Sequence, residues 1–259
     1  MMAHVRLQVH EFGPGAGRTV VALHGVTGVA QVFRRLADRL PDFRLVAPDL
    51  RGHGTSGKEP PWDLSMHIRD IRETLDSMGI SRAPFIGYSF GGRLAVELLA
   101  ADRSRVEKLV LLDPALQMSR ESVTTSTDLL LTDPSFASVE EAIEARRATA
   151  PYAPQEHFDR WAEQLTAGPD GRWRLPVSRA AAITILSELA TPPPPFASLR
   201  IPTLLLVGAE SQMVTPKQIE GYQYELGDFL EVKAVRAKHQ LIGDAADEVA
   251  AAVRAFLAR

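Results

Sequence analysis

Gly87-Tyr88-Ser89-Phe90-Gly91 is the stretch of sequence from which the fold can be predicted. It follows an apolar run at 84–86 and precedes a run with helical spacing at 93–101. Gly-x-Ser-x-Gly between a strand and a helix is typical of a nucleophile elbow, a turn sharp enough to strain the serine backbone. Larger residues two positions to either side would collide with the strand or the helix. The pattern predicts a Ser89 hydroxyl raised above a sheet at a helix N-terminus, and the alternative is a tight turn with an idle serine.

Short apolar runs alternate with segments of helical spacing on both sides of this stretch. A strand with one solvent-exposed face would alternate apolar and polar residues, whereas these runs are apolar throughout. They therefore predict a mostly parallel sheet with helices on both faces, an α/β fold. Ligand sites in such sheets lie at the carboxyl ends of the strands. The predicted strands are 5–12, 19–23, 45–47, 84–86, 106–112, 202–207 and 231–235, and the predicted helices of this part are 32–40, 65–78, 93–101, a helix from 216, and 245–257.

The alternation stops after Asp113 and resumes near residue 202. Three segments between them have helical spacing, at 139–148, 155–165 and 178–189, and turn-forming residues separate them. We therefore expect a core made of residues 1–115 and 197–259, with residues 116–196 inserted as a helical cap or lid.

The composition limits the classes of function. The 259 residues carry a formal net charge of -3, which gives no basic surface for nucleic acid. Cysteine is absent, which excludes disulfides and a thiolate nucleophile. No apolar run reaches the ~18 residues of a membrane span, and no signal peptide is visible at the N-terminus. We expect a cytoplasmic protein, a monomer or homodimer, that needs no cofactor or metal and binds neither nucleic acid nor membrane.

Several segments together resemble the α/β-hydrolase family, over essentially the whole chain. His24-Gly25 after the second predicted strand looks like the family's oxyanion turn, and 49–57 looks like its Asp-x-x-Gly-x-Gly-x-Ser segment. Lys238-His239 before the last helix looks like the late histidine loop. The chain departs from the pattern in one place. Only about twenty residues precede His24, so we expect one edge strand to be missing or very short.

The resemblance implies roles for individual residues. Ser89 would be the nucleophile and His239 the base that takes its proton. The backbone N–H groups of Val26 and Phe90 would bind the oxyanion of the tetrahedral intermediate. The resemblance also implies a pocket beside the elbow, so we expect substrate contacts from His24, Gly25, Tyr88 and Trp173.

The acid that would orient His239 is left open by the sequence. Most of the family places it after the strand at 202–207, as Gly-x-x-Asp, but here that position holds Ser211. Haloalkane-dehalogenase-like and some lactonase branches place it at the end of the strand after the elbow, which here ends on Asp113. Asp113 is our prediction. Glu210, or a serine–histidine dyad without an acid, remains as an alternative.

Arg93 carries a weaker hypothesis. Residues 87–93 resemble the elbow of the menaquinone-pathway succinyl-hydroxycyclohexadiene-carboxylate synthase, in which this arginine helps to hold a carboxylated substrate. The alternative is that Arg93 pairs with a neighbouring acid in the first turn of its helix.

The sequence as a whole predicts a serine hydrolase that cleaves a small-molecule ester or lactone through an acyl-enzyme. A carbon–carbon hydrolase or lyase with the same three residues is one alternative, and a non-catalytic ligand-binding protein of the same fold is another. The identity of the substrate cannot be predicted, because residues of the expected lid would select it.

Overall fold

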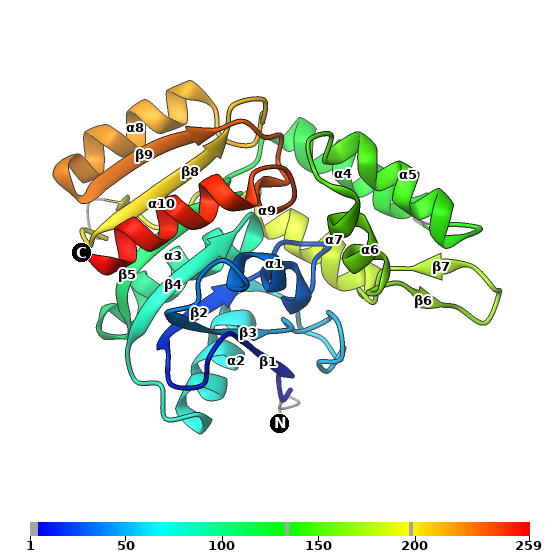
Figure 1. Ribbon diagram of the computed structural model, residues 1–259, viewed down its shortest axis with the longest axis horizontal. Coiled ribbons are helices and arrows are strands. Elements are labelled where there is room, and N and C mark those ends of the chain that lie inside the picture. Colours follow the sequence, from blue (N-terminus) through cyan, green and yellow to red (C-terminus); the bar gives the residue numbers. More distant parts are fainter. Residues whose placement is uncertain (1–4, 133–134, 197–198) are drawn as a thin grey trace.

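The computed structural model describes residues 5–132, 135–196 and 199–259, in which seven strands form one twisted sheet (Figure 1). The order across the sheet is β1-β3-β2-β4-β5-β8-β9. β1 is antiparallel to β3, and every other pair is parallel, so the predicted mostly parallel sheet is confirmed. The strands are β1 (Val9–Phe12), β2 (Arg18–Leu23), β3 (Phe43–Pro48), β4 (Ala83–Tyr88), β5 (Val106–Leu112), β8 (Thr203–Gly208) and β9 (Leu230–Val235).

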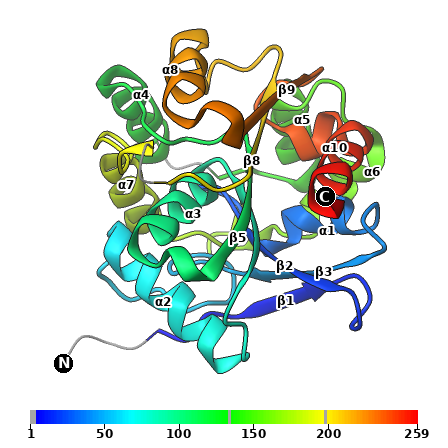
Figure 2. The same cartoon turned by 90° about the vertical axis from the view of Figure 1, so that its left-hand side faces the viewer.

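Helices cover both faces of this sheet, as Figure 2 shows with the sheet nearly edge-on. On one face pack α2 (Leu64–Ser77), α3 (Phe90–Ala101) and α8 (Pro216–Leu226). On the other pack α1 (Arg34–Ala37), α9 (Leu241–Asp244) and α10 (Ala246–Ala258). Short 3-10 turns precede α1 (Ala30–Phe33), link α3 to β5 (Arg103–Arg105) and follow α8 (Gly227–Phe229).

The alternation of side chains along each strand divides the apolar residues between two cores. Phe85 and Leu205 contribute to the core under α2 and α3, whereas their neighbours Ile86 and Leu204 contribute to the core under α10. All four are at most 1% exposed. Burying one such side chain contributes about 1.5–3 kcal/mol, which explains why the central strands read as unbroken apolar runs.

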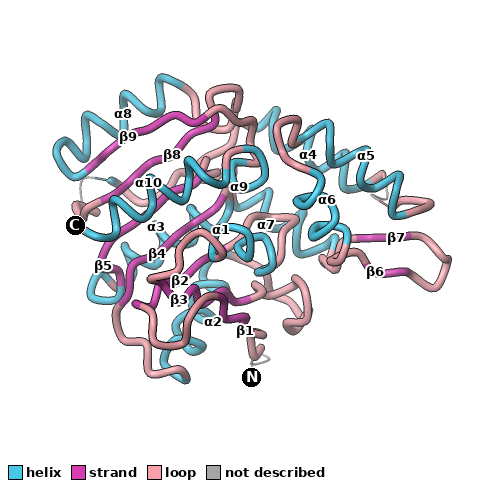
Figure 3. Tube along the Cα trace, viewed as in Figure 1, coloured by secondary structure: helices cyan, strands magenta, loops and turns pink. Residues whose placement is uncertain are grey.

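The segment between β5 and β8 lies beyond the carboxyl ends of the strands, to the right in Figures 1 and 3. It contains the helices α4 (Arg120–Leu131), α5 (Val139–Thr149), α6 (Gln155–Ala162) and α7 (Arg179–Glu188), and a small hairpin of β6 (Thr166–Ala167) and β7 (Trp173–Arg174). The last three helices match the predicted segments. The division into a core and a cap stays a prediction, and its boundary residue 197 lies outside the described residues.

Two local predictions differ from the structure. The helix expected at 32–40 is reduced to a 3-10 turn and the four residues of α1. Pro41 disfavours helical geometry at Leu40, so the helix ends early. The helix α4 was not predicted, because none of its residues is buried and it therefore has no apolar stripe.

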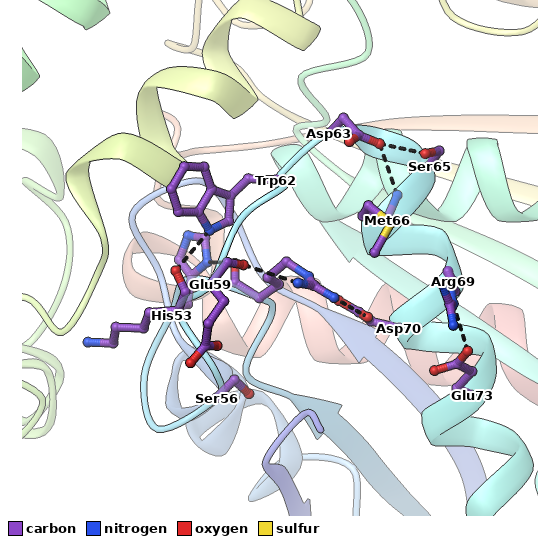
Figure 4. A network of polar contacts seen from close by, with 12 residues as sticks. His53, Ser56, Glu59, Trp62, Asp63, Ser65, Met66, Arg69, Asp70 and Glu73 are labelled. Atoms are coloured by element: carbon purple, nitrogen blue, oxygen red, sulfur yellow. Dashed lines mark hydrogen bonds and ion pairs between the residues drawn. The ribbon is translucent and has the colours of Figure 1, made fainter. Parts of the chain in front are cut away.

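The turn segment at 49–57 is fixed by a buried ion pair. Arg51 donates from Nε and Nη2 to the two carboxylate oxygens of Asp70 on α2, over 2.6 and 2.7 Å. It also donates from Nη1 to the carbonyl oxygen of Glu59, over 3.1 Å (Figure 4). Both charged side chains are at most 2% exposed. These contacts give Arg51 a structural role: they tie the segment to α2 and to Glu59.

Among the residues described, no helix is both long and apolar enough to cross a membrane.

Candidate active site

The elbow residues form a turn with a strained serine. Ser89 follows β4 directly, precedes α3 and has φ 53° and ψ -117°. A non-glycine residue in this region costs about 1–3 kcal/mol and persists only where its surroundings hold it. The Ser89 N–H donates to the carbonyl oxygen of Leu112 on β5, over 3.1 Å. A Cβ at Gly87 would lie 2.5 Å from Cα of Gly92, and one at Gly91 would overlap the carbonyl oxygen of Leu23.

The structure brings Ser89, His239 and Asp113 into one hydrogen-bonded chain. Nε2 of His239 lies 3.1 Å from Oγ of Ser89, and Nδ1 lies 2.6 Å from Oδ2 of Asp113. Asp113 is fully buried at the end of β5, whereas the His239 side chain is 29% exposed in the loop after β9. Parallel strands bring these three distant positions to the same sheet edge, which is where the sequence placed them.

The carboxylate of Asp113 accepts two further hydrogen bonds. The hydroxyl of Ser211 donates to Oδ2 over 2.5 Å, and the N–H of Gly208 donates to Oδ1 over 3.3 Å. Ser211, the residue in the position where the family usually has its acid, is therefore a direct partner of Asp113. Three donors hold the carboxylate in one orientation.

Glu210, the alternative acid, points elsewhere. Its Oε1 accepts a hydrogen bond from the hydroxyl of Tyr152 over 2.6 Å, and its side chain is exposed. Among the contacts of the described residues, none joins Glu210 to His239. The geometry favours Asp113 and a complete chain over both Glu210 and a dyad.

The turn after β2 lies against Ser89 and presents a backbone donor to it. A Cβ at Gly25 would lie 3.1 Å from Cβ of Ser89, so the two backbones are in close approach. The carbonyl of Val26 is tied back to Nε2 of His53 over 2.6 Å, and no backbone acceptor among the described residues takes the Val26 N–H. Phe90 is the first residue of α3, where N–H groups have no intrahelical acceptor. These positions are compatible with the two predicted oxyanion donors, whose role stays a prediction.

A mostly apolar pocket of about 240 Å³ opens onto these groups. Gly25 and Tyr88, two of the residues expected to contact substrate, lie in its wall. The remaining wall comes from the turn after β2, from the segment between β5 and β8, and from the loops after β8 and β9: Val26, Thr27, Gly28, Val32, Ser89, Ala115, Met118, Ser126, Leu129, Leu130, Arg146, Trp161, Gln164, Leu186, Leu189, Met213, His239 and Gln240.

His24 and Trp173, which we expected to contact substrate, lie outside this wall. His24 is fully buried: its Nδ1–H donates to the carbonyl of Gly25 over 2.9 Å, and its Nε2 accepts from the N–H of Leu50 over 2.9 Å. Burial lowers the pKa of His24 to about 3, so the ring stays neutral and in this tautomer. Trp173 on β7 packs against the small apolar cluster around Leu165, and its backbone pairs with Phe136. His24 thus joins the turn after β2 to Leu50, and Trp173 packs within the segment between β5 and β8.

Arg93 does not line the pocket either. It is 1% exposed, and its Nε donates to Glu97, the residue one turn later, over 2.8 Å. Its other nitrogens donate to the carbonyls of Leu116, Thr191 and Pro192 and to the Thr191 hydroxyl. The guanidinium thus ties α3 to the two ends of the segment between β5 and β8, and the substrate-binding hypothesis for Arg93 has no support in this geometry.

Sequence reasoning missed two polar residues of the pocket wall, Gln240 and Arg146, which are hydrogen-bonded to each other. The hydroxyl of Tyr88 lies 2.9 Å from Oε1 of Gln240 and 3.1 Å from the carbonyl of His239. Nη2 of Arg146 donates to the same Oε1 over 2.6 Å. Gln240 could have been noticed as the neighbour of His239, but nothing in the sequence connects either residue to Arg146, which lies on α5.

Within the described ranges, no three His, Asp or Glu side chains are grouped closely enough to bind a metal ion.

Comparisons with known proteins agree with this architecture. A family model described as alpha/beta hydrolase fold matches residues 18–245. The chain is 32% identical to Lipase LipV of Mycobacterium tuberculosis over 260 residues, which cover 98% of each protein. It is 35% identical to Esterase YbfF of Escherichia coli over 97 residues, 37% of this chain and 38% of that one. The crystal structure of E-2-(acetamidomethylene)succinate hydrolase shares the fold, with a TM-score of 0.85 at 24% identity and coverage of 98% and 95%. The chain belongs to the α/β-hydrolase family.

Proposed function

We propose that this protein is a serine hydrolase that cleaves a carboxylic ester or lactone through an acyl-enzyme. The observation that carries the proposal is the chain of hydrogen bonds from the buried Asp113 through His239 to Ser89, at the wall of an apolar pocket. Similarity to proteins named lipase and esterase supports the same class of substrate.

In the acylation step, Oγ of Ser89 attacks the substrate carbonyl while Nε2 of His239 takes the hydroxyl proton. The carbonyl oxygen becomes an oxyanion, which the N–H groups of Val26 and Phe90 stabilise. Asp113 holds the proton on Nδ1, so Nε2 is free to accept, and its charge stabilises the imidazolium that forms. The imidazolium then protonates the leaving alkoxide as the carbon–oxygen bond breaks.

In the deacylation step, the same groups act on water. His239 takes a proton from a water molecule, whose oxygen attacks the acyl carbonyl, and the carboxylic acid leaves as Ser89 regains its proton. With a lactone, the leaving alkoxide remains part of the acyl group, and the product is a hydroxy acid.

We further propose that residues 116–196 form a cap over the site, with residues 1–115 and 197–259 as the core. Support comes from the pocket wall, to which α4, α6 and α7 bring Leu129, Trp161 and Leu186. Because these side chains are apolar, they favour a hydrophobic acyl or alcohol part of the substrate.

A fluorophosphonate probe tests this function directly. We expect stoichiometric labelling of the wild type at neutral pH and none of Ser89→Ala, together with hydrolysis of p-nitrophenyl esters or of a lactone panel. A wild type that resists labelling, or labelling that persists in Ser89→Ala, would contradict the proposal. Labelling of Ser89 without hydrolysis of any ester or lactone would instead favour the carbon–carbon hydrolase or lyase chemistry.

A further inference from the structure

Arg146 is an unusual residue in a pocket wall that is otherwise mostly apolar. It lies on α5 in the same pocket as Ser89 and His239, with its guanidinium carbon 5.4 Å from the centre of the Trp161 ring. Nη2 donates to Gln240, but Nε is buried and has no hydrogen-bond partner among the described residues. A buried N–H without an acceptor costs about 1–3 kcal/mol, more on a charged group, so it is a position where a ligand atom would be stabilised.

Arg146 also has no direct ion-pair partner among the described residues. None of the ion pairs recorded for the described part of the chain involves it, whereas the next residue, Arg147, pairs with Glu144. Arg160 on α6 likewise pairs with Asp38 and Glu156. The charge of Asp244 acts on Arg146 without forming a direct ion pair with it. Because an arginine stays protonated even where burial is unfavourable, an anion in direct contact with its guanidinium would be stabilised there. Burial lowers the pKa of Arg146, and the charge of Asp244 acts in the opposite direction without cancelling this shift.

A second, smaller cavity of about 30 Å³ adjoins this position. It shares four wall residues with the main pocket: Val32, Arg146, Trp161 and Gln164. Two more of its wall residues have a buried nitrogen without a partner in the described ranges, namely Nε of Arg35 and Nε2 of His157. Among described residues, neither cavity has an Asp or Glu in its wall. The described wall of the pocket near Arg146 therefore has several buried nitrogens without a partner and no carboxylate.

We propose that Arg146 recognises a carboxylate on the substrate, so that the natural substrate is an ester or lactone with a second, anionic group. This inference rests on the proposed function. A guanidinium has five N–H donors, and the bond to Gln240 uses one, which leaves enough for a two-point contact with a carboxylate. The apolar side chains of Met118, Leu129 and Leu130 would line the carbon chain between the carboxylate and the reacting carbonyl.

A purely structural role is the competing explanation, because Gln240 follows His239 directly. Through the bond to Gln240, Arg146 could simply hold α5 against the loop of the base. In that case its loss would lower the turnover of every ester by the same factor. A contact with substrate would instead change the ratio between charged and neutral substrates, mainly through KM.

The experiment compares matched esters in two arms. The first arm sets monomethyl esters of C4 to C8 dicarboxylic acids against methyl esters of monocarboxylic acids of equal length. The second sets butyrate esters of ω-hydroxy acids against those of the corresponding alcohols, in case the carboxylate is on the leaving group. The variants are Arg146→Gln and Arg146→Lys, with Arg147→Gln on the same helix as control.

We expect the wild type to prefer the charged ester in at least one arm. Arg146→Gln should lower the charged-to-neutral ratio of kcat/KM by roughly 10–100-fold, the range of a hydrogen bond to a charged group. Arg146→Lys should restore part of it, and Arg147→Gln should leave the ratio unchanged. No charge preference in either arm, or an equal loss for both substrates in Arg146→Gln, would overturn the inference.

Calorimetric titration separates this inference from the proposed function. In the Ser89→Ala background, which cannot turn over, the charged ester preferred in the assay should bind at least 10-fold more tightly when residue 146 is arginine than when it is glutamine. If no ester is hydrolysed by the wild type, the same titration is run with every charged ester of both arms. Equal affinity with arginine and with glutamine at residue 146 would then refute carboxylate recognition. Failure of turnover alone would refute only the proposed hydrolase function.

Discussion

Asp113→Asn replaces a carboxylate with an amide of the same shape at a position where three donors converge. The amide has one acceptor oxygen and one NH₂ group. If its oxygen takes the place of Oδ2, it can accept from His239 and Ser211, but the NH₂ group then faces the N–H of Gly208, 3.3 Å away in the wild type. If the amide is reversed, the NH₂ group faces Nδ1 of His239, which must then be unprotonated.

The reversed amide removes general-base catalysis, since a neutral imidazole without a proton on Nδ1 has one on Nε2. That nitrogen, 3.1 Å from Oγ of Ser89, can then no longer take the hydroxyl proton. In either orientation the negative charge that stabilises the imidazolium is lost. The same change in a serine protease lowers kcat by about 10⁴. Here we expect a loss of about 10³–10⁴, which corresponds to about 4–5.5 kcal/mol in the activation barrier.

The assay is hydrolysis of the best p-nitrophenyl ester, with labelling by the fluorophosphonate probe as a second readout. Glu210→Gln is the matched control, because it makes the same chemical change at an acid that contacts Tyr152, and we expect it to stay within about threefold of the wild type. Thermal unfolding checks that both variants are folded. A loss of less than tenfold in Asp113→Asn, or a larger loss in Glu210→Gln, would refute the assignment of the acid.

Three further substitutions test other parts of the structure. Ser211→Ala removes one of the three donors to Asp113, so we expect roughly tenfold slower ester hydrolysis, and a loss as large as that of Asp113→Asn would contradict this supporting role. Burial lowers the pKa of His67 to about 3, so between about pH 6.5 and pH 3 only the unfolded state takes up a proton at this residue. His67 should therefore lower the free energy of unfolding of the wild type as the pH falls through this range, by up to about 1.4 kcal/mol per pH unit. His67→Phe should flatten that slope in urea unfolding measured at pH 7 and pH 4.5, and an unchanged slope would count against it. Arg93→Leu should lower the free energy of unfolding by about 3–5 kcal/mol, since it leaves buried acceptors and Glu97 without a partner, and a loss below 1 kcal/mol would be inconsistent with this.

The parts of the fold that could be predicted are those whose signal is local. The elbow is a turn that only glycine-flanked serine fits, and the central strands are unbroken apolar runs because both of their faces are buried. The helix α4 could not be predicted, as its residues are in contact with solvent and carry no periodic pattern. His67 on α2 is 1% exposed, with its ring edge-on to Phe90. A single polar residue in a helix gives no local sign of which side it faces.

In the site, too, the residues that could be predicted are those with a local sequence motif. Ser89 and His239 could be identified because each occupies a motif of its own. Asp113 was predicted as the acid with Glu210 and a dyad as alternatives, because the choice depends on which side chain reaches Nδ1 of His239. That distance is set by the pairing of β5 with β8, a contact between residues nearly a hundred positions apart. Arg146 could not be placed for the same reason, since its partner Gln240 lies 94 residues away.

That pairing has a consequence for how this protein can evolve or be engineered. Leu112 and Leu206 lie side by side in adjacent strands, so the chain leaves the sheet after β5 and returns in the neighbouring strand β8. The two anchor points are fixed by ladder hydrogen bonds, whatever the length of the polypeptide between them. Loop-closure entropy grows only with the logarithm of that length, so added residues there cost little closure entropy. We therefore expect length changes inside the segment, away from the contacts of Arg93 with its two ends, to alter which molecules are accepted while the reacting groups keep their positions.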